Sequence, residues 1–199
     1  MNSSICLLGS SNSGKTSFVN KLIDSNQLFN SPTIGVEFTS QHFKTQDGII
    51  TWNIWDCGGF YKCLNIFSSY ISNSDIYLVF LDMTQPMKYQ QIDNYFKIIN
   101  DIKCNPKIIL VCTKADLTQI IDDKKINNIC ENYNIDYLKI SLKDDSFNFL
   151  IDKVNSYIRK MPKKNNIEYK KNNIEYKKKK TIDYNSKHAD NNRYCCCIF

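Results

Sequence analysis

Short apolar runs alternate with segments of helical spacing through residues 1–160 of the chain. Apolar runs bounded by glycine, asparagine or charged residues predict strands. These runs lie at residues 4–9, 36–44, 49–56, 76–82, 107–112 and 137–141. Apolar positions three and four residues apart predict helices at residues 15–25, 90–103, 122–133 and 146–160.

The strands differ in how their apolar side chains are arranged. Residues 76–82 and 107–112 are almost continuously apolar, which is typical of strands covered on both faces. Residues 36–44 and 49–56 flank Asp47-Gly48, a hairpin signal. This order predicts an α/β fold with a six-stranded, mostly parallel sheet, one antiparallel edge strand and helices on both faces. Ligands of such sheets bind beyond the carboxyl ends of the strands.

The periodic pattern ends at Met161-Pro162. The heptapeptide KNNIEYK occurs at residues 164–170 and again at 171–177, and residues 177–180 are all lysine. A repetitive, polar and basic segment buries too little apolar surface to fold. We therefore expect one domain over residues 1–160 and a disordered basic tail over residues 161–199. The alternative is an extension of the last helix, which Pro162 disfavours.

The formal charge of +6 belongs to this tail, because acidic and basic residues balance over residues 1–160. A neutral folded part argues against a folded face that binds a nucleic-acid polymer, and the tail indicates a charged arm. No apolar run approaches the ~18 residues of a membrane span. The first residues lack the pattern of a secretory signal, and Asn2 excludes N-myristoylation, so we expect the body of the protein in the cytosol.

The chain has nine cysteines, and most of them are scattered without C-x-x-C spacing. A zinc site or a disulfide framework is therefore not expected. Cys6, Cys112 and Cys130 are predicted to be small core residues. The last three, at residues 195–197, crowd the C-terminus, where no core is predicted.

Residues 9–16, GSSNSGKT, match the phosphate-binding pattern G-x-x-x-x-G-K-[ST]. They follow a predicted strand and open a predicted helix, so backbone N–H groups and the helix N-terminus can cradle phosphates. Lys15 is expected to reach the β and γ phosphates, and the Thr16 hydroxyl to bind Mg²⁺. A plain glycine–serine turn is the alternative, and the strand–loop–helix context disfavours it. The predicted contacts are Ser11, Asn12, Ser13, Gly14, Lys15, Thr16 and Ser17.

The segment Thr113-Lys114-Ala115-Asp116 directly follows a predicted strand and resembles the N-K-x-D motif of GTPases. The carboxylate of Asp116 can accept hydrogen bonds from N1–H and the 2-amino group of guanine, a pair of donors that adenine lacks. The stem of Lys114 is expected to cover the purine face. Thr113 replaces the first Asn of the motif, a change expected to loosen the loop.

A second base motif follows the last predicted strand. Ser141-Leu142-Lys143 resembles the S-A-K motif, in which a backbone N–H, here that of Leu142, meets guanine O6. Leu in place of Ala keeps this N–H and adds bulk, so base affinity is expected to fall. Each short motif is weak evidence alone, but both follow predicted strands and occur in the order in which GTPases carry them.

Residues 32–38, PTIGVEF, resemble switch I and the effector-recognition strand of the Rab branch of the Ras-like GTPases. The resemblance covers roughly residues 4–160, including Trp55 and Tyr70, and implies a Ras-like fold. It also implies that the Thr33 hydroxyl binds Mg²⁺ and its N–H contacts the γ-phosphate; the alternative is an ordinary strand-entry residue. Phe29 is the candidate for the aromatic ring that packs on guanine.

Residues 56–61, DCGGFY, align without a gap to the family sequence D-T-A-G-Q-E. The resemblance implies that Asp56 holds Mg²⁺ and that Gly59 offers its N–H to the γ-phosphate, so the catalytic residues are Lys15, Thr33 and Gly59. Phe60 replaces the Gln that orients the attacking water, and we expect slow hydrolysis with nucleotide binding intact. Gly58-Gly59 also resembles the Arf-type D-x-G-G-Q, but residues 32–38 and the C-terminal cysteines favour Rab.

The last four residues, Cys196-Cys197-Ile198-Phe199, fit the C-a-a-X pattern, with Phe last favouring geranylgeranyl. The adjacent cysteines also resemble the doubly prenylated ends of Rab proteins, so we expect Cys196 and Cys197 to be prenylated. The alternatives are an unmodified disordered tail or a fortuitous metal site of three thiols. Stable anchoring needs two signals, which a second prenyl group, an acyl chain on Cys195 or the lysines at 177–180 could supply.

These motifs predict a Rab-like GTPase that binds GTP or GDP with Mg²⁺ and switches in vesicle trafficking. We expect it at the cytoplasmic face of an intracellular membrane, with a cytosolic pool. The resemblance implies effectors bound through the two switches, an exchange factor, a GTPase-activating protein, a prenyltransferase with its escort protein and a GDP-dissociation inhibitor. The alternative is a pseudo-GTPase that binds GTP without hydrolysing it. A P-loop kinase is disfavoured, because nothing resembles a phosphoacceptor lid.

Overall fold

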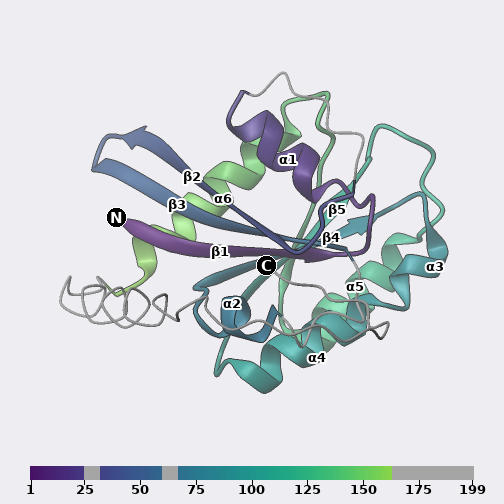
Figure 1. The fold of residues 1–199 in the computed structure, drawn as a ribbon. Coiled ribbons are helices and arrows are strands. Elements are labelled where there is room, and N and C mark those ends of the chain that lie inside the picture. The colour runs from purple at the N-terminus through teal and green to yellow at the C-terminus, as the bar shows by residue number, and fades with distance from the viewer. Residues whose placement is uncertain (25–31, 60–66, 163–199) are drawn as a thin grey trace, which may run out of the picture. The chain divides into compact units, whose positions relative to one another are not determined.

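The apolar runs of the chain form a six-stranded sheet with helices packed around it (Figure 1). The computed structural model describes residues 1–24, 32–59 and 67–162, and Met1–Lys160 forms one compact unit. The strands are β1 (Asn2–Gly9), β2 (Val36–Thr45), β3 (Gly48–Cys57), β4 (Ile76–Asp82), β5 (Lys107–Thr113) and β6 (Asp136–Lys139). The helices are α1 (Lys15–Leu22), α2 (Ser68–Ser72), α3 (Pro86–Tyr89), α4 (Ile92–Ile102), α5 (Asp123–Tyr133) and α6 (Ser146–Lys160).

The strands follow the order β2-β3-β1-β4-β5-β6 across the sheet. Strands β2 and β3 form an antiparallel hairpin at one edge, and all the other neighbouring strands pair in parallel. This topology confirms the predicted α/β fold with a mostly parallel sheet and one antiparallel edge strand. The loops after β1, β5 and β6 consequently leave the sheet at the same edge, where ligands of such sheets bind.

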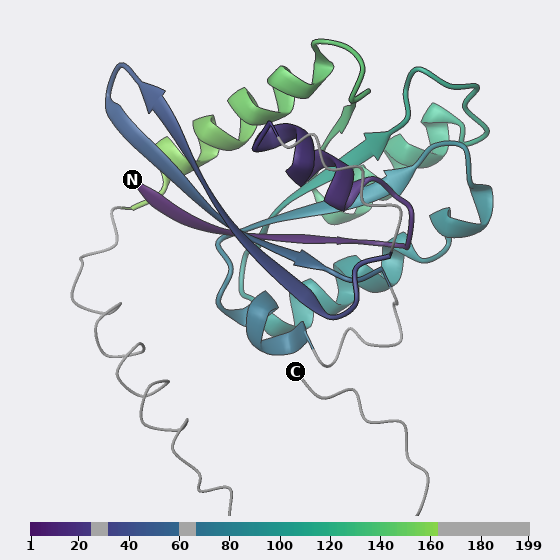
Figure 2. The same cartoon turned by 45° about the horizontal axis from the view of Figure 1, so that its top comes forward.

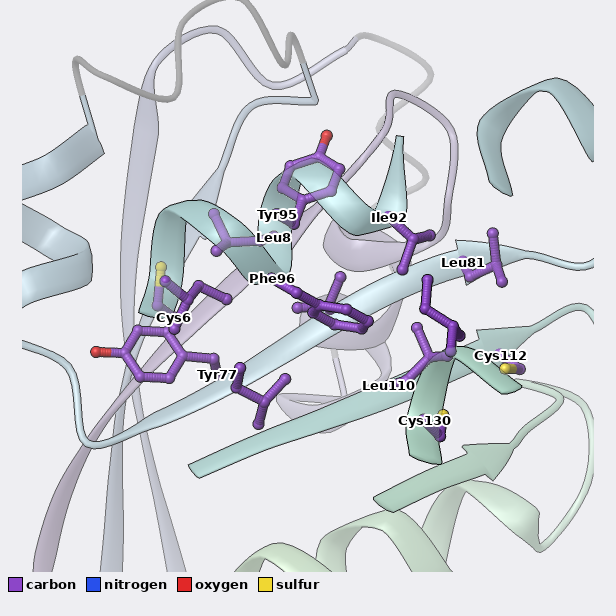
Figure 3. Close-up of a cluster of buried hydrophobic side chains, with 14 of the residues drawn as sticks. Cys6, Leu8, Tyr77, Leu81, Ile92, Tyr95, Phe96, Leu110, Cys112 and Cys130 are labelled. Carbon is purple, nitrogen blue, oxygen red and sulfur yellow. The ribbon is translucent and has the colours of Figure 1, made fainter. Parts of the chain in front are cut away.

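The central strand β4 is buried along its whole length, because helices cover both of its faces. Tyr77, Val79 and Leu81 face a cluster formed with α2, α4 and α5 (Figure 3). On the opposite face, Phe80 contacts Phe18 of α1, with ring centroids 5.5 Å apart, and Phe18 also packs on α6. Figure 2 shows α1 and α6 on one side of the sheet and α2 and α4 on the other.

Two helices were not predicted, and several boundaries differ. Helices α2 and α3 are too short to show a helical period in the sequence, although Pro86 suits the first turn of α3. Helix α4 begins at Ile92 rather than at residue 90. Strand β6 ends at Lys139, two residues before the predicted end, which leaves Ser141 in the loop that carries the second base motif.

Cys6, Cys112 and Cys130 are buried, which confirms that they are core residues. The thiols of Cys6 and Cys57 lie 3.7 Å apart inside the core. All cysteines within the described residues are free thiols. Within the same residues, no helix combines the length and the apolar character that crossing a bilayer requires.

Candidate nucleotide and magnesium site

The phosphate-binding motif lies in the turn between β1 and α1, and its conformation depends on glycine. Gly9 has φ 139° and Gly14 has φ 95°, values that side chains disfavour. A Cβ atom on Gly9 would lie only 2.5 Å from the carbonyl oxygen of Phe80 in the neighbouring strand β4. The turn can therefore pass this close to the sheet only with glycine at its start.

Lys15 is folded back into this turn. Its Nζ donates to the carbonyl oxygens of Gly9 (2.9 Å) and Ser10 (3.1 Å). Burial lowers the pKa of Lys15 to about 8, although the nearby Asp56 carboxylate raises it. The ammonium group is therefore held inside the loop, in the place from which a cation can contact phosphates bound by the backbone N–H groups.

Three oxygen-bearing side chains from separate segments meet beside this loop. The Thr16 hydroxyl donates to Oδ2 of Asp56 (2.5 Å), and the hydroxyls of Thr16 and Thr33 lie 2.7 Å apart. Oδ1 of Asp56 is buried without a hydrogen-bond partner. Burial raises the pKa of Asp56, while the Thr16 hydrogen bond and the charge of Lys15 lower it.

These three residues fit a magnesium ion. Carboxylate and hydroxyl oxygens are hard donors of the kind that Mg²⁺ prefers. A buried carboxylate oxygen without a partner is costly unless a cation or a donor satisfies it. Within the described residues no cluster of three His, Cys, Asp or Glu side chains could hold a metal.

The first base motif is tied to the phosphate loop. The Thr113 hydroxyl donates to the carbonyl oxygen of Ser13 (2.8 Å) and is also 3.2 Å from that of Leu81. The hydroxyl thus joins this loop to two neighbouring segments. The expected loosening by the change from Asn to Thr stays a prediction.

Lys114 and Asp116 are each held in place by a side-chain contact. Lys114 has φ 61°, and its Nζ lies 2.6 Å from Oδ2 of Asp82, which is buried at the end of β4. Oδ1 of Asp116 accepts from the Ser141 hydroxyl (2.9 Å), and Oδ2 lies 2.8 Å from Nζ of Lys143. The hydrogen bonds from Lys143 and Ser141 lower the pKa of Asp116, which keeps the carboxylate ionised.

Switch I (residues 32–38) and the described part of the second switch segment, switch II (residues 56–59), touch each other and the phosphate loop. The N–H of Gly58 donates to the carbonyl oxygen of Gly35 (2.8 Å). A Cβ atom on Gly58 would lie 2.7 Å from the carbonyl oxygen of Thr33, and one on Gly59 would lie 2.2 Å from the backbone nitrogen of Ser11. Both glycines are therefore required for this close packing.

An aromatic strip runs from β2 across β3 to α2, next to the switches. The ring centroids of Phe38 and Trp55 are 4.7 Å apart, and those of Trp55 and Tyr70 are 5.0 Å apart. Phe38 is 54% exposed and Ile34 is 89% exposed. This strip of Phe38, Trp55 and Tyr70 is an apolar surface that is continuous with switch I.

Asp82 is a residue that the sequence patterns did not single out. It accepts hydrogen bonds from the backbone N–H and the hydroxyl of Thr84 as well as from Lys114. The bonds from Lys114 and Thr84 lower the pKa of Asp82. Charged residues are rarely buried, so an Asp at the carboxyl end of a buried strand could have marked Asp82 in the sequence.

The structure describes only some of the remaining predicted site residues. Asn12 lies in the phosphate loop with φ 61°, and Leu142 and Lys143 follow β6. Ser17 lies in the first turn of α1. The predictions for Phe29, Phe60 and Tyr61, and those for the basic tail with Cys196 and Cys197, lie outside the described residues.

Comparison with known proteins places this geometry in a sequence context. The family model described as the Ras family matches residues 4–161. A probable Rab-related GTPase of Acanthamoeba polyphaga mimivirus is 31% identical over 160 residues, which cover 75% of this chain and 73% of that protein. The Ras-related protein Rab-32D of Dictyostelium discoideum is 29% identical over 150 residues, or 70% of this chain and 65% of that protein. The Ras-related protein RABA1h of Arabidopsis thaliana is 27% identical over 141 residues, which cover 69% of this chain and 65% of that protein.

Proposed function

The chain belongs to the Ras family of small GTPases, as a Rab-related member, and we propose that it is a membrane-associated GTP/GDP switch with slow intrinsic hydrolysis. Members of this family bind guanine nucleotides, generally with Mg²⁺. The single observation that carries the proposal is the meeting of three predicted motifs at one edge of the sheet. Three separate segments each place one side chain at this edge: Lys15, Asp56 and Asp116.

Guanine is the base that this site suits best. Asp116 is kept ionised, and its two oxygens are aligned by Ser141 and Lys143. An ionised carboxylate accepts two hydrogen bonds from the N1–H and the 2-amino group of guanine and finds no matching pair on adenine. Lys114, anchored by Asp82, would lie along the purine face.

Thr16, Thr33 and Asp56 would hold Mg²⁺, which neutralises charge on the phosphate oxygens when it is bound. Thr33 belongs to switch I and Gly59 to switch II, and both would also offer backbone N–H groups to the γ-phosphate. The approach of Gly58 to the carbonyl oxygen of Thr33 and of Gly59 to Ser11 supports coupling of both switches to that phosphate. GTP would order the switches, and loss of the phosphate would release them.

Slow hydrolysis follows from the residue at position 60. The family uses a Gln there to orient the attacking water, and Phe60 has no group that can hold water. A GTPase-activating protein that supplies a Gln and an Arg in trans would restore the rate. This observation also favours a second candidate, a pseudo-GTPase that binds GTP without hydrolysing it.

The partners are proposed from one exposed surface, and the location from the C-terminal sequence. The aromatic strip and the exposed Ile34 form the surface that we assign to effectors, because exposed aromatic residues favour protein partners. We further propose that an exchange factor, a GTPase-activating protein and a GDP-dissociation inhibitor act on the switches. Prenylation at Cys196 and Cys197 by a prenyltransferase with its escort protein would hold the protein on the cytoplasmic face of an intracellular membrane for vesicle trafficking.

Nucleotide content and turnover of the purified protein test this proposal. We expect co-purified GDP or GTP, affinity for both, and far weaker affinity for ATP. Equal affinity for ATP, or no nucleotide binding, would contradict the proposal. Single-turnover hydrolysis with and without cell extract separates the two candidates, since only the slow GTPase shows a measurable rate that the extract stimulates.

A further inference from the structure

Lys88 is a basic residue beside the phosphate loop for which neither the motifs nor the family resemblance supplies a role. It lies in α3, far from the loop in sequence, yet its Nζ donates to the carbonyl oxygen of Ser11 at 2.7 Å. The side chain is partly buried. Lys15 and Lys88 thus donate hydrogen bonds to three successive carbonyl oxygens of the loop, those of Gly9, Ser10 and Ser11.

The charge of Lys88 is not balanced by a carboxylate in the part of the chain that the structure describes. None of the ion pairs found there includes Lys88. Residues 25–31 and 60–66 contain no Asp or Glu. A lysine ammonium has three N–H donors, and the Ser11 carbonyl uses one of them. A partly buried cation with free donors is suited to an anion.

The position of Lys88 points to the terminal phosphate. Gly59, whose N–H we assign to the γ-phosphate, packs directly against the backbone nitrogen and Cα of Ser11. Lys88 reaches the same residue from α3, and Lys15 donates to the two preceding carbonyl oxygens of the loop. Both ammonium groups therefore lie at the loop that would hold the polyphosphate chain.

The backbone around Lys88 is also well anchored. The N–H of Lys88 donates to the carbonyl oxygen of Gln85 (3.1 Å), and its own carbonyl oxygen accepts from Gln91 at the same distance. The next residue, Tyr89, donates its hydroxyl to the carbonyl oxygen of Lys125 (2.7 Å). The ammonium is therefore presented from a fixed turn.

We propose that Lys88 is a phosphate-binding residue supplied in cis, which contacts the terminal phosphate of bound GTP in addition to Lys15. The inference rests on the proposed function, because it requires that the site binds GTP. A second cation at the terminal phosphate stabilises the charge that develops during phosphoryl transfer, as arginine residues do when they are supplied in cis or in trans. In this chain it would partly compensate for the missing Gln at position 60.

The test compares nucleotides with and without the terminal phosphate. Lys88→Met keeps the length of the side chain and removes its charge. We expect affinity for the slowly hydrolysed analogue GTPγS to fall about tenfold, the usual loss for one charge-assisted hydrogen bond, while GDP affinity changes less than about twofold. Lys88→Arg should keep both affinities. The matched control is Lys44→Met, an equal loss of charge at an exposed position of β2 next to the hairpin turn.

The alternative is that Lys88 only fastens α3 to the phosphate loop. In that case Lys88→Met would weaken GDP and GTPγS equally, and this result would overturn the inference, as would unchanged affinity for both. Lys88→Gln, which keeps an N–H donor without the charge, should lose GTPγS affinity relative to GDP affinity to the same extent as Lys88→Met. If the native protein binds neither nucleotide, the proposed function fails. If the native protein binds both, and Lys88→Met has the same ratio of GTPγS affinity to GDP affinity as the native protein, only the inference fails.

Discussion

At the scale of single residues, Thr113 shows that a changed motif position can tie two loops together. Thr stands in place of the family Asn, and its hydroxyl donates to the carbonyl oxygen of Ser13 in the phosphate loop. Asp116 and Lys114 are each fixed by a partner, Asp116 by Ser141 and Lys143 and Lys114 by Asp82. Preorganised groups of this kind lose less conformational entropy when a ligand binds.

The base specificity is predicted to depend on Asp116. Asp116→Asn places an N–H₂ group opposite the 2-amino group of guanine, so one hydrogen bond is lost and the other is no longer made to a charged group. GTP affinity should fall by about 100-fold. Xanthosine triphosphate, which has an oxygen at that position, should then be preferred. Titration of both nucleotides measures the change. Asp152→Asn, at an exposed position of α6, is the control, and unchanged GTP affinity in Asp116→Asn would refute the assignment.

The pKa of Lys15 predicts a pH dependence of nucleotide binding. Burial lowers this pKa to about 8, and phosphate oxygens beside the ammonium would raise it again. The bound form would thus hold a proton that the free protein loses above pH 8, so affinity should be greatest below that pH and fall as pH rises through it.

Calorimetry in buffers of different ionisation enthalpy measures this effect as proton uptake on GDP binding near pH 8. Lys15→Met should bind more weakly and show no such uptake. Binding that takes up no proton in the native protein would contradict the assignment of Lys15 to the phosphates.

The residue at position 60 is predicted to limit hydrolysis. Phe60→Gln should raise the intrinsic single-turnover rate at least several-fold, because a carboxamide can again orient the attacking water. Phe60→Leu exchanges one apolar side chain for another and should leave the rate unchanged. Equal rates for the native protein and Phe60→Gln would mean that another change in this segment, such as Cys57 or Tyr61, limits the reaction.

At the scale of elements, helices are fastened to the sheet by both apolar faces and single buried hydrogen bonds. In β4, Tyr77 points to the face covered by α2, and its hydroxyl donates to the carbonyl oxygen of Ile71 in that helix (2.6 Å). Across the sheet, the Trp52 indole N–H of β3 donates to Oδ1 of Asn155 in α6 (2.9 Å), and both residues are buried.

The bond between Trp52 and Asn155 is predicted to stabilise the docking of α6. Asn155→Ala leaves the buried indole N–H without its acceptor and should lower the free energy of unfolding by about 2 kcal/mol. Denaturant unfolding measures this loss. Asn148→Ala, at an exposed position of the same helix, serves as the control and should change stability by less than about 0.5 kcal/mol. If both variants unfold at the same denaturant concentration, the bond contributes no stability.

At the scale of the whole molecule, charge and chemistry are divided along the sequence. Acidic and basic residues balance over residues 1–160, and the net charge of +6 comes from residues 161–199, which contain three consecutive cysteines near their end. A neutral domain leaves the switches free to select partners by shape and apolar contact, whereas basic residues near a lipid anchor favour an anionic leaflet. Nucleotide binding and membrane binding are therefore expected to be separable.

The tail prediction tests this separation. Replacing both Cys196 and Cys197 with Ser should leave GTP affinity unchanged and move the protein into the soluble fraction of a cell lysate, because a basic segment without a lipid anchors weakly. Cys104→Ser, at an exposed position of the folded part, should leave fractionation unchanged. Sedimentation of the double variant with membranes, or an unmodified C-terminus by mass spectrometry, would contradict prenylation.

The sequence by itself determined the fold class and the family of this protein. Continuous apolar runs at β4 and β5 indicated buried parallel strands, and Asp47-Gly48 marked the antiparallel hairpin. The phosphate loop was also predictable, because its strand, glycines and lysine are contiguous and act through their own backbone. Short elements such as α2 and α3 escaped prediction, because four or five residues carry no period.

Only the tertiary structure decided which distant side chains meet. Lys88 and Ser11 are 77 residues apart, Thr16 and Asp56 are 40 apart, and Lys114 and Asp82 are 32 apart. Family motifs pointed to Thr16 and Asp56, but no pattern marked Lys88 or Asp82. Local periodicity records which face of an element is buried. The reach of one side chain across the edge of the sheet depends instead on strand order, register and the packing of the turns, which no local pattern records.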